Sequence, residues 1–270
     1  MMRFNWLYFI GALLVSALLL LVSCEKVVEV QLKNSNAKYV IEGVMTNETG
    51  RCRVKITTTN DFKASNEFAG VAGAVIKIES KGVIYNLKDM GNGIYQHSTV
   101  KGVPGQTYQL TVSLNDQTFT ASSTMPLGLP FQDMFIARND FSTTKAVVNV
   151  RYADIPAAKN YYWFQQYVNG IEQSAFGLVT DEFSDGQEII ASLLFENTTG
   201  DSSKDFKKGD RLTVEMHNIE APIYTYLLSL YGASGTDNGT PFANPQSNLS
   251  GGALGYFSAH TTQRKVVVIP

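Results

Sequence analysis

The residues of this sequence that could carry chemistry are few, and their spacing favours no enzyme class. His97, His217 and His260 are too far apart in sequence for a helical metal-binding pair, although two could still meet in space. Each histidine is therefore expected to be a surface or hydrogen-bonded side chain. Ser35 and Lys38 match the S-x-x-K spacing in which a lysine assists a serine nucleophile, but companion motifs are missing. No catalytic residue is predicted.

Carboxylates gather in two polar stretches. The first, VTDEFSDGQE, holds Asp181, Glu182 and Asp185, and the second spans residues 201–210. Carboxylate oxygens from loops are the ligands of hard cations such as Ca²⁺. The spacing of an EF-hand loop is absent, however, and charged loops are usually only solvated. We therefore predict no metal site and no cofactor.

Aromatic residues are the remaining candidates for a binding surface. Exposed aromatic rings stack on sugars or anchor protein interfaces. Neighbouring side chains of a strand point to opposite faces, so about half of the aromatic run 161–163 is expected to be core. The candidates for ligand binding are Tyr162, Trp163, Phe242, Tyr256 and Phe257.

The first half of the chain is predicted to form an immunoglobulin-like β-sandwich over residues 39–125. Apolar residues such as Val54 and Ile56 alternate with charged neighbours, as half-buried strands require. Gly- and Asn-containing turns separate the runs at residues 90–93 and 115–116. About seven short strands at this spacing are typical of a sandwich.

The second half is predicted to be a separate β-rich domain over residues 131–270. Two prolines and a glycine in MPLGLP, residues 125–130, indicate the boundary before it. Two last strands, at 254–259 and 265–269, are expected to close this domain. The fold class is therefore mainly β.

One amphipathic helix interrupts the second half near residues 222–231. Pro222 suits a first helical turn, and Gly232 suits the residue just past the end. The residues expected to share the buried face are Ile223, Tyr226, Leu227 and Leu230.

The N-terminal sequence predicts where the protein is located. Arg3 precedes an apolar run of about 16 residues, shorter than the roughly 20 that span a bilayer, so residues 1–23 indicate a lipoprotein signal peptide. The residues LVSC at 21–24 resemble the bacterial lipobox, which implies that Cys24 carries the lipid anchor. Residues 24–38 are then a lipidated N-terminus and stalk, or in part a first strand; both alternatives are open. Several acyl chains hold a protein stably at a membrane.

Composition excludes other classes. Lys and Arg number 22 against 24 Asp and Glu, for a net charge of −2, so no nucleic-acid partner is predicted. The only cysteines are Cys24 and Cys52. With Cys24 lipidated, a disulfide framework and a cysteine-based zinc site are excluded, and Cys52 is expected to be a small buried hydrophobe.

Four stretches carry a family resemblance. These are EKVV directly after Cys24, NYYWF at 160–164, GDRLTVEMHNI followed by IYTYLLSL, and PFANPQSNLSGGALGYFSAH at 241–260. Together they resemble the family named domain of unknown function 4249, predicted outer-membrane lipoproteins of Bacteroidota. The resemblance implies an outer-membrane location and a frequent genomic association with TonB-dependent receptors, and it carries over no catalytic residues.

The expected function follows from this address. We expect a non-enzymatic outer-membrane lipoprotein, anchored in the membrane by its lipid, that is an accessory or ligand-binding component of a TonB-dependent nutrient-uptake system. The alternative is a structural or adhesive lipoprotein of the cell envelope. Exposure to the periplasm or to the cell surface is left open.

Overall fold

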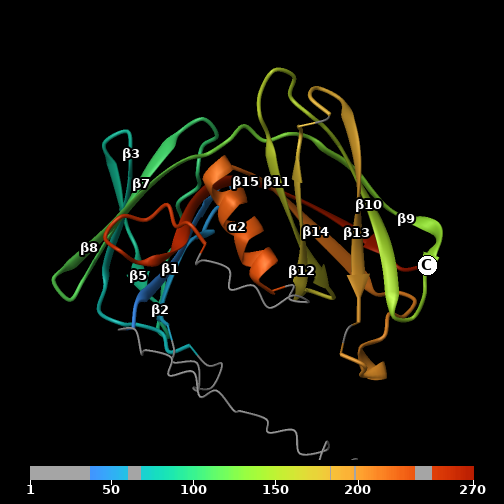
Figure 1. Cartoon of the computed structure of the whole chain (residues 1–270), viewed down its shortest axis with the longest axis horizontal. Coiled ribbons are helices and arrows are strands. Elements are labelled where there is room, and N and C mark those ends of the chain that lie inside the picture. The colour runs from blue at the N-terminus through green and yellow to red at the C-terminus, as the bar shows by residue number, and fades with distance from the viewer. Residues whose placement is uncertain (1–36, 60–67, 183, 198, 235–244) are drawn as a thin grey trace, which may run out of the picture. The chain divides into compact units, whose positions relative to one another are not determined.

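The computed structural model describes residues 37–59, 68–182, 184–197, 199–234 and 245–270, and Ala37–Pro270 forms one compact unit (Figure 1). Within these ranges the fold is mainly β with a single α-helix, as the sequence predicts. The signal peptide, Cys24 and residues 25–36 of the stalk lie outside the described residues and stay predictions. Phe242 also lies outside them.

The strands of the first half are β1 (Tyr39–Thr46), β2 (Cys52–Thr58), β3 (Val75–Ser80), β4 (Val83–Asn86), β5 (Lys88–Asp89), β6 (Ile94–His97), β7 (Thr107–Leu114) and β8 (Gln117–Thr124). The second half holds β9 (Phe131–Phe141), β10 (Lys145–Ala153), β11 (Tyr161–Val168), β12 (Ile171–Thr180), β13 (Glu188–Glu196), the short 3₁₀ helix η1 (Ser202–Lys204), β14 (Arg211–Ile219), the helix α2 (Ala221–Ser234) and β15 (Leu254–Val268).

These strands form three sheets. The largest has the order β12-β11-β14-β15-β1-β2-β6-β5 and therefore takes strands from both halves of the chain. A four-stranded sheet, β4-β3-β7-β8, and a three-stranded sheet, β13-β10-β9, complete the fold. One sheet thus joins the parts of the chain before and after residues 125–130. The division into two domains at these residues stays a prediction.

The first hydrophobic core lies between the four-stranded sheet and the β1, β2 and β15 part of the large sheet. Ile41, Val54, Ile56 and Phe257 are fully buried in it and pack with β3, β7 and β8 residues. Cys52 is also fully buried here, and burial raises the pKa of its thiol to about 12. The period-two pattern and the expectation for Cys52 are confirmed.

The second core lies between the three-stranded sheet and the β11 and β14 part of the large sheet. Its residues of 0% exposure from these elements are Ala146, Val148, Val150, Tyr152, Tyr162, Phe164, Leu212, Val214 and Met216. Each β11 and β14 residue on this face has neighbours that point to the opposite face, where α2 packs. The large sheet is thus covered by sheets on one face and by a helix on the other (Figure 1).

Strand β15 corrects the prediction of two closing strands. It is one strand of 15 residues that pairs in parallel with β1 through residues 254–260 and antiparallel with β14 through 261–268. The polar residues 261–264 do not interrupt the strand, because they pair with residues 215–218 of β14, and the N–H of Thr262 also donates to Asn47 Oδ1 at 2.7 Å. Gly255 has φ +100°, and an added Cβ would lie 2.1 Å from the Ile41 carbonyl oxygen.

Helix α2 is longer than predicted, because it continues to Ser234. Ile223, Tyr226 and Leu227 are buried against the large sheet, as expected, but Leu230 is 44% exposed. The packed stripe therefore ends after Leu227. Within the described ranges no helix combines the length and apolar character needed to cross a bilayer.

Candidate functional site

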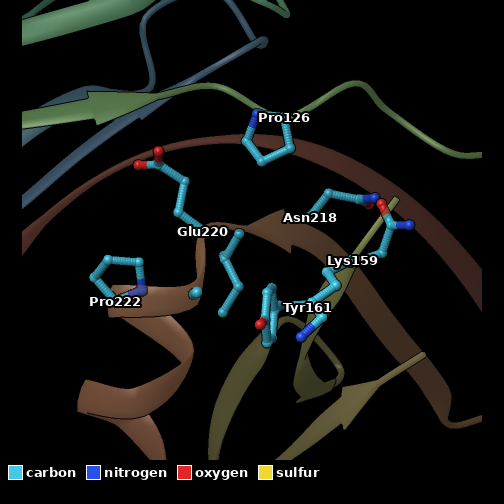
Figure 2. Close-up of a pocket in the computed structure, with 9 residues that line it drawn as sticks. Pro126, Lys159, Tyr161, Asn218, Glu220 and Pro222 are labelled. Atoms are coloured by element: carbon cyan, nitrogen blue, oxygen red, sulfur yellow. The ribbon is translucent and has the colours of Figure 1, made fainter. Parts of the chain in front are cut away.

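A pocket of about 330 Å³ lies where β14 passes into α2 (Figure 2). Three separate segments line it: Pro126 after β8, residues 159–161 at the start of β11, and residues 218–222 at the β14–α2 junction. Figure 2 shows Pro126 above, Glu220 and Pro222 on one side, and Lys159 with Asn218 on the other. This volume is at the lower end of the range for small-molecule sites.

Glu220 alone connects β14 to α2 and shapes one wall. Its backbone carbonyl accepts the N–H groups of Ile223 and Tyr224, both at 3.1 Å, and so begins the helix. Its carboxylate accepts the hydroxyl of Ser123 at 2.5 Å, and that hydroxyl in turn accepts the N–H of Ala259 at 2.8 Å. The carboxylate is therefore fixed at the pocket by residues of β8 and β15.

Asn218 is the unusual residue of the lining. It is 2% exposed, yet neither Oδ1 nor Nδ2 of its side chain has a hydrogen-bond partner in the described structure. A buried polar group without a partner costs about 1–3 kcal/mol, so native proteins rarely keep one. Asn218 thus offers a free donor and a free acceptor at the pocket.

The remaining lining groups supply complementary chemistry. Lys159 is exposed and brings an ammonium group, Glu220 brings a carboxylate, and Tyr161 brings a ring that packs on Tyr224 with centroids 5.2 Å apart. An aromatic ring beside amide and charged groups is a set that recognises small polar molecules. The arrangement is therefore suited to binding.

A buried ionic cluster lies on the same face of the large sheet as α2. The Glu215 carboxylate is 3% exposed and accepts both Nη groups of Arg51 at 3.1 Å and Nε of Arg264 at 2.9 Å. Burial by itself raises the pKa of Glu215, but the two guanidinium groups outweigh it and hold the pKa below its usual range. The cluster joins the β1–β2 turn to β14 and β15.

Two histidines meet beside this cluster, with ring centroids 4.8 Å apart. His217 Nδ1 pairs with the Thr262 hydroxyl at 3.0 Å, and His260 Nδ1 pairs with the Ser258 hydroxyl at 2.9 Å. Burial, helped by the nearby cations, lowers the pKa of His260 to about 4 and that of His217 well below its usual value. Both rings are therefore neutral at pH 7, and the 3.7 Å approach of His217 Nε2 to Glu215 is not an ion pair.

A family model, described as a domain of unknown function, DUF4249, matches residues 25–266. That match covers nearly the whole sequence. The chain belongs to the DUF4249 family. No curated protein matches it.

One similar solved structure is a DUF4785 family protein from Legionella pneumophila. It shares 10% sequence identity with this DUF4249 chain at a TM-score of 0.24, over 67% of this chain and 51% of the Legionella chain. The DUF4249 chain thus spans about half the length of that protein.

The four aromatic candidates that the structure describes in this DUF4249 chain do not form an exposed surface. Tyr162 and Phe257 are fully buried in the two cores, and Tyr256 is 8% exposed beneath α2. Trp163 is half-buried against His217, with ring centroids 4.8 Å apart. Their burial removes the exposed stacking surface on which the sequence argument depended, and ligand binding by these residues stays a prediction.

The pocket residues were missed at the sequence level for a physical reason. Asn218 lies on the same buried face of β14 as Val214 and Met216. A polar residue in this apolar alternation was the sequence feature that could have indicated a site. Lys159 lies beside Asn160 in a turn, and nothing in sequence brings it near Glu220. Only the pairing of β11 with β14 places them together, with Tyr161 opposite Ile219.

Proposed function

We propose that this chain is a non-enzymatic lipoprotein of the outer membrane that binds a small polar nutrient, such as a sugar, and serves as an accessory of a TonB-dependent receptor. The observation that carries the binding role is Asn218, whose buried amide has no partner beside an aromatic ring and two opposite charges. A ligand hydroxyl or carbonyl would satisfy that amide.

The address rests on the N-terminal pattern. Residues 1–23 have the build of a signal peptide, and the lipobox-like LVSC supports a lipid anchor on Cys24. The family match begins at Glu25, the residue directly after this cysteine. The outer-membrane location and the TonB-dependent partner are what the resemblance to DUF4249 implies, and both are part of the proposal.

The partner is tested by a pulldown of the tagged full chain from its native outer membrane in mild detergent. Mass spectrometry then identifies the N-terminus of the bait and its partners. An acylated Cys24 with a co-purifying TonB-dependent receptor supports the proposal. An acylated Cys24 without a receptor, together with a defect in surface attachment on deletion, favours a structural or adhesive lipoprotein instead. An intact Met1 would overturn the proposed cleavage of the signal peptide and the lipid anchor on Cys24.

The pocket gives a second prediction. Replacing Asn218 by leucine should weaken binding of a sugar found in a thermal-shift screen by about tenfold, the equivalent of one hydrogen bond. The same change should leave the free energy of unfolding equal or higher, because it removes an unpartnered polar group. Calorimetric titration and urea unfolding measure the two effects.

Asn248 provides the matched control. Its amide is satisfied, since Nδ2 donates to the Phe257 carbonyl at 2.8 Å and Oδ1 accepts the Phe257 N–H at 2.9 Å. Asn248→Ala should therefore cost about 1–3 kcal/mol of stability and leave sugar affinity unchanged. A loss of stability in Asn218→Leu equal to that in Asn248→Ala would contradict the binding role of Asn218.

A further inference from the structure

Three aspartates from two loops converge at one end of the second core. Asp154 follows β10, while Asp181 and Asp185 lie between β12 and β13. One carboxylate oxygen from each lies within 4.8 Å of the others. Asp154 and Asp181 are 6% and 5% exposed, whereas Asp185 is exposed and faces solvent.

Backbone and side-chain donors hold these carboxylates in place. Asp154 accepts the N–H of Gly186 at 2.9 Å and the hydroxyl of Tyr162. Asp185 accepts the N–H of Ala157 at 2.8 Å. The two loops are thus bound to each other through their carboxylates, and these hydrogen bonds fix the positions of the carboxylates.

The third carboxylate connects this cluster to the pocket. Asp181 accepts both the backbone N–H and the side-chain amide of Asn160, at 2.8 Å and 3.2 Å. Asn160 also lines the pocket, next to Lys159. The position of the cluster therefore sets the position of one pocket wall.

The cluster lacks a cation of its own. Among the described residues no Lys, Arg or His forms an ion pair with Asp154, Asp181 or Asp185. Buried charges in proteins are paired or coordinate metals. Three neighbouring carboxylates, two of them buried, repel one another unless a cation neutralises them.

An unsatisfied hydroxyl gives an independent indication. Tyr152 is fully buried, its ring lies 4.7 Å from that of Tyr162, and its Oη has no hydrogen-bond partner in the described structure. Tyr152 precedes Asp154 by two residues at the end of β10, so the two buried side chains lie on the same face, and the hydroxyl of the neighbouring Tyr162 donates to Asp154. The Tyr152 hydroxyl is therefore buried beside the cluster, where a water bound to the cation would complete its bonding.

We propose that Asp154, Asp181 and Asp185 bind a divalent cation of the Ca²⁺ type. All the converging ligands are oxygen atoms, which suits a hard cation, and loop carboxylates allow the irregular coordination that Ca²⁺ accepts. Waters supply the rest of its shell. The sequence pattern of residues 181–185 alone does not include Asp154, because this third carboxylate comes from a part of the chain about 27 residues earlier. The site stands independently of the sugar-binding proposal.

The test is a calorimetric titration of the purified full chain in detergent, stripped with EDTA, with CaCl₂ alone. We expect binding with Kd about 10⁻⁴–10⁻³ M, as in extracellular calcium modules, and a rise in the thermal midpoint. Asp185→Asn removes a charged metal ligand. It should weaken Ca²⁺ binding by at least about 10–100-fold, which is the loss caused by mutating a residue that only hydrogen-bonds to a metal ligand. This variant keeps Oδ1 for the Ala157 N–H and should fold normally by circular dichroism in EDTA.

Glu182→Gln is the matched control, because it removes an exposed carboxylate of the same turn that is outside the cluster. It should bind Ca²⁺ like the wild type. Tyr152→Phe is a second variant that removes only the unpartnered hydroxyl; it should weaken Ca²⁺ binding without lowering stability in EDTA. Absence of binding to the wild type, or equal weakening in Asp185→Asn and Glu182→Gln, overturns the site. Neither result bears on sugar binding, which is measured separately.

Discussion

Replacing Arg51 and Arg264 together by methionine is expected to lower the free energy of unfolding by about 3–5 kcal/mol, the cost of leaving a buried charge without its partner. The two guanidinium groups donate to Glu215, which is 3% exposed and has no other cation at hydrogen-bond distance in the described structure. Methionine keeps the packing of the side-chain stems, so the loss reports the charge. Denaturation in urea measures it.

The opposite substitution should cost less. Glu215→Leu leaves two arginines whose side chains are 38% and 43% exposed and can turn to water. A loss with Glu215→Leu that equals or exceeds the loss in the double arginine variant would contradict this account. Arg53→Met, at an exposed position of β2, controls for removal of a cation and should stay within about 0.5 kcal/mol of the wild type.

Local patterns in the sequence predict much of this fold. The turn at residues 91–93 closes β5 onto β6, with positive φ at all three residues, and Asn115 and Asp116 form the β7–β8 turn at φ 48° and 58°. These features depend on neighbours in sequence. The continuity of β15 does not, because its polar middle is stabilised by Asn47 from a distant turn.

The sites were less predictable, because they depend on contacts between distant segments. Aromatic type alone does not reveal that Phe257 fills a core while Tyr161 lines a pocket. Likewise Asp181 and Asp185 acquire a partner in Asp154 only through two loops that connect different sheets. The signal that could have been used was a polar residue, Asn218, on a buried strand face.

Acidification is the second change with a large expected effect. His217 and His260 have pKa values below that of an unfolded histidine, about 6.5. Above pH 6.5 both states hold neutral rings, and the stability contribution is fully present. Below it the unfolded chain takes up protons that the folded chain refuses, so stability must fall with falling pH.

The size of this loss follows from the pKa of His260, about 4 in the fold. Each histidine lowers the free energy of unfolding by up to about 1.4 kcal/mol per pH unit, so His260 alone accounts for about 3 kcal/mol between pH 6.5 and 4. His217 adds a loss of the same sign. Glu215, whose pKa is also depressed, loses its contribution only as the pH falls below the usual range of a carboxyl group.

Urea unfolding at a series of pH values from 7.5 downward tests this account in the wild type and in the double variant His217→Gln, His260→Gln. The wild type should lose stability steeply below pH 6.5, and the double variant should lose most of that slope. His97→Gln, which changes the histidine of β6, controls for loss of a histidine outside the cluster and should keep the steep limb. Equal slopes in the wild type and the double variant would show that acid sensitivity arises elsewhere, because only groups whose proton affinity changes on folding can produce it.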